Sequence, residues 1–169
     1  GVAAYSTLGW FDDPLVSPMF RYPDPVVVGI VFHELVHQRL YFPGDSAFNE
    51  ALASAVADAG VRAYLTATDP LAVPDYERRR ARRRAFVALV LETREALRAV
   101  YEGAGSEKEK HAAKARILER TRRRYAQLDA VRGGDAGYDR FFDEGLNNAR
   151  LASVATYEAL VPAFTAILE

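Results

Sequence analysis

An apolar stretch early in the chain contains three polar side chains in the order His-Glu-x-x-His, at residues 33–37. Asp24 suits a helix N-cap, because its carboxylate accepts a free backbone N–H, and Pro25 suits the first helical position, where that N–H has no partner anyway. Residues 26–40 are apolar nearly all round, so the pattern predicts a central, buried helix. Residues 41–45, Tyr-Phe-Pro-Gly-Asp, end it, and a second helix is expected over residues 46–66.

The spacing of the two histidines has a physical reason. His33 and His37 are four residues apart, which places them on one face of the helix, about 6 Å apart along its axis. Two imidazoles so placed can bind one Zn²⁺ at roughly 2.0–2.1 Å each. Glu34 is rotated about 100° around the helix from His33, so it is a poor third ligand but can accept a proton from water on the metal. Ordinary core histidines are the weaker interpretation, because burying these groups among Val, Ile and Leu is costly without compensation.

A catalytic zinc needs a third protein ligand and keeps the fourth position open. A histidine six residues after His37, as in metzincins, is excluded because position 43 is a proline, and His111 lies on a polar, basic helix where a solvated role fits better. Glu50 is the stronger candidate. It begins an otherwise apolar stretch on the second helix, which the tight link at residues 43–45 should fold back against the first. The alternative is a solvated Glu favoured by the helix dipole.

The rest of the chain reads as mostly helical. Residues 75–101 and 106–131 show helical patterns, and Ser106 with Glu109 forms a capping box for the second of them. The short connection between them predicts an antiparallel hairpin over residues 74–132. A short strand is expected at residues 4–8, and residues 138–169 are apolar enough to fold back onto the core. We expect one domain over residues 1–169, of class mainly α, becoming α+β in the full protein.

Composition excludes several other classes. The chain has no cysteine, so neither a disulfide nor a thiolate zinc site is possible, and its net charge of −1 gives no general preference for nucleic acid or anionic membranes. No apolar run is long enough to suggest a membrane span. Arginines cluster at residues 78–80, 82–84 and 122–124, but glutamates share the same helices, which is typical of a solvated surface. No nucleic-acid partner is therefore expected.

The pattern resembles that of the gluzincin metallopeptidases, in which HExxH is followed on a second helix by NExx(S/A)(D/A). His33, Glu34, His37 and Glu50 match its residues in order. The link between the helices is shorter than in thermolysin or the thermolysin-like aminopeptidases. The Asp that the pattern expects four residues after the Glu ligand is Ser54 here, so Ser54 is the candidate to orient a ligand.

A closer resemblance is to a bacterial family of predicted aminopeptidases. It rests on residues 4–15 (AYSTLGWFDDPL), 32–38 (FHELVHQ), 47–50 (AFNE) and 145–157 (GLNNARLASVATY), and it spans nearly the whole chain. Full-length relatives carry a further N-terminal region that often begins with an export or lipoprotein-type signal. The resemblance therefore implies the C-terminal catalytic part of a longer protein, which contacts that missing N-terminal region, and a location in the bacterial cell envelope, periplasmic or lipid-anchored.

The resemblance also suggests the remaining catalytic parts. Zincins commonly bind the substrate backbone along an edge strand, and the strand formed by Tyr5, Ser6, Thr7 and Leu8 is the candidate here. Thermolysin-like aminopeptidases use a tyrosine as oxyanion donor, which implies Tyr157, with Asn147, Asn148 and Arg150 as alternatives. A carboxylate that pairs with the substrate α-amine could be Asp12, Asp13 or Glu158.

These observations predict a zinc-dependent metallopeptidase with one Zn²⁺, most consistent with an aminopeptidase acting on peptide substrates. Zinc would polarise the scissile carbonyl, and Glu34 would move a proton from the attacking water to the leaving amine. Two alternatives remain open: a zinc-binding protein without turnover, and a helical interaction module whose Arg-rich hairpin binds an acidic partner.

Overall fold

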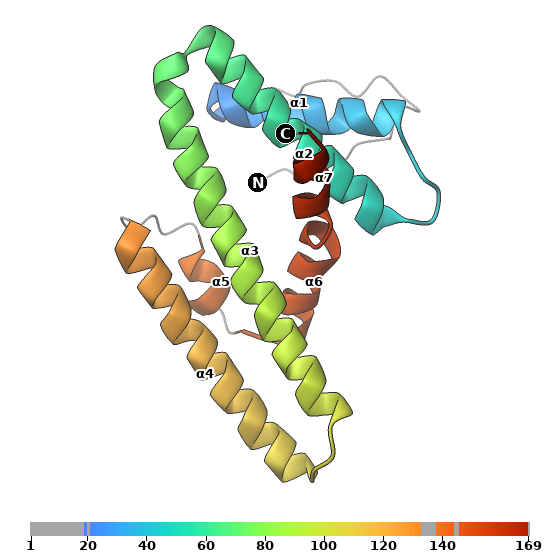
Figure 1. The fold of residues 1–169 in the computed structure, drawn as a ribbon, viewed down its shortest axis with the longest axis vertical. Coiled ribbons are helices and arrows are strands. Elements are labelled where there is room, and N and C mark those ends of the chain that lie inside the picture. Colours follow the sequence, from blue (N-terminus) through green and yellow to red (C-terminus); the bar gives the residue numbers. More distant parts are fainter. Residues whose placement is uncertain (1–18, 20, 133–137, 144–145, 169) are drawn as a thin grey trace. The chain divides into compact units, whose positions relative to one another are not determined.

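The computed structural model describes residues 19, 21–132, 138–143 and 146–168, and this part of the chain is mainly helical, without strands (Figure 1). The strand expected at residues 4–8 lies outside the described residues. The helices, in chain order, are α1 (Asp24–Arg39), α2 (Ser46–Thr68), the 3₁₀ turn η2 (Pro70–Ala72), α3 (Val73–Glu102), α4 (Glu107–Arg132), α5 (Asp139–Asp143), α6 (Asn148–Glu158) and α7 (Val161–Leu168).

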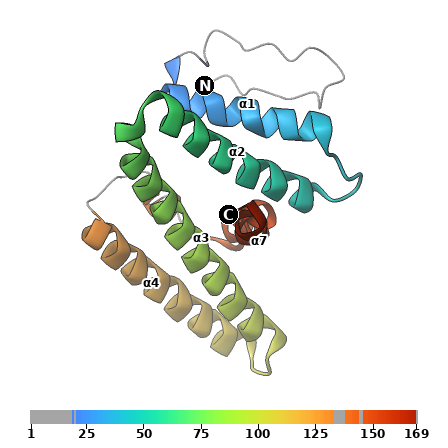
Figure 2. The same cartoon turned by 45° about the horizontal axis from the view of Figure 1, so that its top comes forward.

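The chain divides into two compact units. The first comprises Gly1–Glu77 together with Tyr157–Glu169, and the second comprises Arg78–Thr156. In the first unit α1 and α2 lie side by side and run in opposite directions, and α7 packs against α2 (Figures 1 and 2). The predicted pair of helices is therefore present, joined by the short link at residues 40–45.

A glycine on α2 allows α1 and α2 to approach closely, because Gly60 lies directly under the ring of Phe32 from α1. Ala51, Ala53, Ala55 and Ala57 of α2 are also buried. A Cβ atom at position 60 would come within 2.6 Å of that ring, which is closer than packed atoms tolerate. This glycine is required by the space between the helices.

Two expectations for α1 are corrected by the structure. The residue that precedes the helix is Pro23, no side chain caps it, and Asp24 is its first helical residue, where its charge suits the helix dipole. The helix is also not buried on every side: Val36 and His37 are buried, whereas the side chains of Val26 and Leu35 are nearly half exposed. Packing against α2 covers one face, and an apolar sequence alone does not show how many faces have a partner.

In the second unit α3 and α4 run antiparallel as the expected hairpin (Figure 2). The capping box is confirmed, because the Ser106 N–H donates to Glu109 Oε2 at 2.8 Å, and this bond lowers the pKa of Glu109 below its ordinary value. The buried hydroxyls of Thr93 and Thr121 bond across the hairpin at 2.8 Å. The core around them contains Phe86, Val87, Leu89, Val90, Leu97, Leu118, Phe142, Leu146 and Leu151.

Candidate metal centre

The link between α1 and α2 is a tight turn that starts the second helix at once. Pro43 and Gly44 are its central residues, the Asp45 N–H donates to the Phe42 carbonyl at 3.3 Å, and Gly44 has a φ of 86°. Pro followed by a residue with positive φ is the signature of a type II turn, which favours glycine at that place. The Asp45 carboxylate then accepts the Phe48 N–H at 3.0 Å and caps α2.

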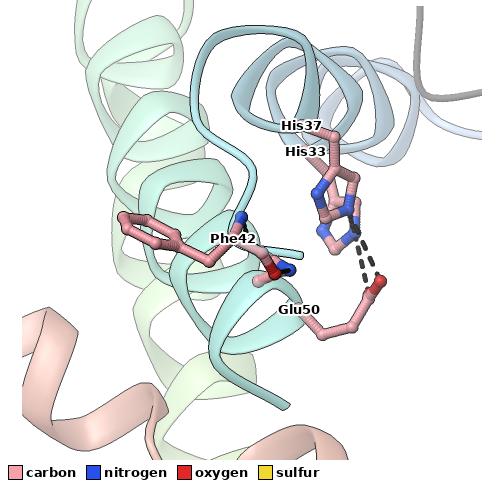
Figure 3. A network of polar contacts seen from close by, with 5 residues as sticks. His33, His37, Phe42 and Glu50 are labelled. Atoms are coloured by element: carbon pink, nitrogen blue, oxygen red, sulfur yellow. Dashed lines mark hydrogen bonds and ion pairs between the residues drawn. The ribbon is translucent and has the colours of Figure 1, made fainter. Parts of the chain in front are cut away.

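This link brings Glu50, in the first turns of α2, to the two histidines of α1 (Figure 3). Glu50 Oε2 lies 3.2 Å from His33 Nε2, Glu50 Oε1 lies 3.5 Å from His37 Nε2, and the two Nε2 atoms are 3.1 Å apart. The imidazole rings meet nearly edge to face, at an interplanar angle of 81°. The three side chains that the sequence selected as ligands are therefore gathered at one place.

These separations fit a single metal ion. Ligand atoms at 2.0–2.1 Å from a tetrahedral ion lie roughly 3.3–3.4 Å from one another. The separations here are 3.1, 3.2 and 3.5 Å, the last two measured to different oxygens of Glu50, and one ligand atom from each of the three residues lies within 4.8 Å of the others. Both Nε2 atoms can direct their lone pairs at one cation, whereas without a cation one must be protonated to bond the other. The side chain of His37 is 4% exposed and that of Glu50 is 33% exposed, so the group is buried on one side and accessible on the other.

Two polar atoms beside this group are buried without a hydrogen-bond partner in the described part of the chain. They are Glu34 Oε2 and His37 Nδ1. An unsatisfied buried polar atom costs about 1–3 kcal/mol, so such atoms in a folded protein often mark functional chemistry. Glu34 does not belong to the potential metal-binding group, as its place on the helix predicts. Glu34 thus lies directly after one ligand residue in the sequence, and its Oε2 has no described hydrogen-bond partner.

Asn49 is a residue whose role the sequence analysis missed. It is 2% exposed, and its amide makes two hydrogen bonds to the backbone of Phe42: Oδ1 accepts the N–H at 2.9 Å and Nδ2 donates to the carbonyl at 2.8 Å. A buried amide must find partners of both kinds. The available signal was an asparagine directly before Glu50 at the start of an apolar helix.

Several predicted site residues fall outside what the structure describes. Residues 5–8, Asp12 and Asp13 lie outside the described residues, as does the side chain of Tyr157, so their assigned roles stay predictions. Ser54 is half-buried and makes no described hydrogen bond to His33 or Glu50, so its role is also untested. His111 is exposed on α4, as expected for a solvated residue.

The alternative oxyanion donors have partners within the second unit. Asn147 Oδ1 accepts the Arg150 N–H at 3.0 Å and so caps α6. Asn148 Nδ2 donates to the hydroxyl of Tyr101 at 3.3 Å, and the Arg150 guanidinium donates to the Phe141 carbonyl at 3.0 Å. These contacts give all three residues a structural role.

Three neighbouring arginines of α4 pair with glutamates. Arg122 and Arg123 both approach Glu119, at 4.0 and 3.1 Å, and Arg124 binds Glu92 of α3. These side chains are exposed, and exposed ion pairs contribute about 0–1 kcal/mol each. This is the pattern expected of a solvated hairpin, although it does not test nucleic-acid binding.

A protein-family model matches this chain. The model of the family described as "Putative aminopeptidase" matches residues 1–169, which is the whole chain. No curated protein and no solved structure matches. In the described residues no helix is both long and apolar enough to cross a membrane.

Proposed function

The chain belongs to the "Putative aminopeptidase" family, and on that premise we propose that it is a zinc-dependent peptidase. His33, His37 and Glu50 hold one zinc ion, and Glu34 is the general base. The observation that carries the proposal is the convergence of two imidazole nitrogens and one carboxylate from two helices, with separations of 3.1–3.5 Å. Few arrangements other than a metal site gather these groups so closely on a partly open surface.

The metal and the protein divide the chemistry between them. A bound zinc ion supplies Lewis-acid polarisation of the scissile carbonyl and lowers the pKa of water at the open position. The Glu34 carboxylate, whose Oε2 has no other described partner, accepts the proton of the attacking water and delivers it to the leaving amine. The partial exposure of His33 and Glu50 gives the substrate its approach.

Further parts of the site extend the proposal. We assign the chain to the gluzincin-type enzymes, an assignment supported by the ligand order with a glutamate on the second helix, and the family's description favours removal of N-terminal residues from peptides. We assign Tyr157 as oxyanion donor and residues 5–8 as the substrate-binding strand. A bacterial origin and a place in the cell envelope belong to the same proposal.

The Glu34→Gln variant tests the proposal. It retains the three ligands, so we expect one zinc ion per chain in both proteins by metal analysis. Hydrolysis of a peptide library by the variant should fall by about 10²–10⁴-fold, because a general base contributes that much. Peptides with blocked N-termini distinguish removal of terminal residues from internal cleavage.

Two results would contradict this function. Wild-type protein without stoichiometric zinc would rule out the metal site and favour the interaction module. Zinc-loaded wild type and Glu34→Gln with equal, negligible hydrolysis would indicate a zinc-binding protein without turnover.

A further inference from the structure

The amide of Asn49 joins the two helices that carry the candidate metal ligands. We propose that Asn49 is a positioning residue, which sets the place of the Glu50 carboxylate at His33 and His37 by locking the backbone of Phe42. This inference rests on the proposed function, because it concerns the same metal centre. It gives a physical role to the asparagine that the pattern places directly before the glutamate, a residue to which the sequence analysis assigned none.

Asn49 and Phe42 each donate one hydrogen bond to the other and accept one from it. Phe42 offers one backbone donor and one backbone acceptor, and the Asn49 side chain satisfies both, at 2.9 and 2.8 Å. Asn and Gln present a donor and an acceptor side by side on one neutral amide, and Asn does so on the shorter stem. With Asn49 2% exposed, water cannot replace either bond without opening the link.

The hydrogen bonds between Asn49 and Phe42 join two segments that adjoin the ligand residues, so they restrict how those residues are placed. Phe42 lies in the link between α1 and α2, five residues after His37. Asn49 directly precedes Glu50 in α2. Consecutive helical residues differ in direction by about 100°, so a fixed Asn49 also fixes the direction of Glu50. Figure 3 shows this division: the Glu50 carboxylate reaches the histidines, while the ring of Phe42 points away from them.

Other contacts hold the link in the first unit independently of Asn49. The ring of Phe42 meets that of Phe48 at 4.7 Å, and Phe48 meets Phe164 of α7 at 4.9 Å, both edge to face. Asp45 caps α2 as well. Loss of the amide should therefore leave the helices folded and packed, and change chiefly the precision with which Glu50 is presented.

Zinc affinity and the visible spectrum of bound Co²⁺ measure that precision directly. We compare the wild type, Asn49→Ala and Phe164→Leu by chelator-competition titration. Phe164→Leu is the matched control, because it weakens packing in the same unit and removes neither hydrogen bond between Asn49 and Phe42. Residues that orient metal ligands typically change affinity by 10–100-fold, so Asn49→Ala should weaken zinc binding at least about tenfold and alter the Co²⁺ spectrum. Phe164→Leu should lower the melting temperature and leave both readouts unchanged.

Circular dichroism establishes that each variant is folded. If Asn49→Ala does not fold, Asn49→Asp replaces it: the aspartate keeps an oxygen that accepts from the Phe42 N–H and replaces the donor with a charged acceptor that cannot bond the Phe42 carbonyl. Wild-type affinity and spectrum in the folded Asn49 variant overturn the inference, as does an equal loss in Phe164→Leu. Neither readout requires turnover, so a zinc-binding but inactive wild type would refute the proposed function alone.

Discussion

At the scale of single residues, the candidate site follows from helix geometry and one turn. The four-residue spacing of His33 and His37 is sufficient to predict that both rings share a face, because backbone geometry alone fixes it. Glu50 follows less directly, since its position depends on Pro43 and Gly44 reversing the chain. Asn49 could not be assigned, because its partner is the backbone of Phe42, and backbone groups are the same at every residue.

Removal of the Glu50 carboxylate provides a test at this scale. Glu50→Ala deletes one of three proposed ligands, so zinc affinity should fall by more than the roughly 10–100-fold typical of an orienting residue. Isothermal titration with zinc measures the change. Glu77→Ala is a matched control: its side chain is also 33% exposed in the same unit, but it pairs with Arg62 rather than with a histidine. Equal affinities in the two variants would show that Glu50 is not a ligand.

At the scale of helices, the sequence predicted where helices form better than it predicted which faces of each helix are buried by neighbouring elements. Helix ends at residues 45–46 and 106–107 agree with their capping residues, Asp45 and Ser106, because capping is local chemistry. Burial of α1 was overestimated, because its apolar residues surround the helix whereas its described packing partner, α2, covers one face. A helix cannot encode in its own sequence how many neighbours it will have.

The contact between α1 and α2 predicts the effect of a small substitution. Gly60→Ala would force a methyl group into the Phe32 ring. Overpacking costs about 1–3 kcal/mol, which should exceed the gain of about 1 kcal/mol in helix propensity. Urea unfolding monitored by circular dichroism should therefore show reduced stability.

Gly29→Ala on the facing helix is the control for this substitution. Its new methyl group would meet Val61 at an ordinary 3.4 Å, so stability should stay equal or rise. An increase in the stability of Gly60→Ala would mean that the helices separate more easily than the structure indicates.

At the scale of the whole molecule, the candidate centre lies in one of the two units. All three ligands belong to the first unit, so zinc should stabilise that unit specifically. At a free zinc concentration of 100 times the dissociation constant, the expected gain is about 2.7 kcal/mol. Hydrogen exchange followed by mass spectrometry should show slower exchange in residues 24–50 with zinc and no change in α4.

Chelation should reverse this protection, and Glu50→Ala should not acquire it. Protection spread evenly over both units, or absent from α1, would contradict a zinc site made by these three residues. The comparison is internal to each sample, because α4 reports on the unit without the proposed ligands.

Contacts between neighbouring residues could be predicted from the sequence: the first four long helices, the capping box at Ser106, the tight link at residues 43–45, and the helix face shared by the two histidines. Contacts between distant residues became known only from the folded chain: the approach of Glu50 to both rings, the absence of a described partner for Glu34 Oε2, and the hydrogen bonds between Asn49 and Phe42. The backbone of a helix has regular geometry, so the relative directions of nearby side chains can be predicted from the sequence. The 3.2 Å distance between His33 Nε2 and Glu50 Oε2 depends on how closely α1 and α2 pack, and Gly60, which has no methyl group, allows that packing.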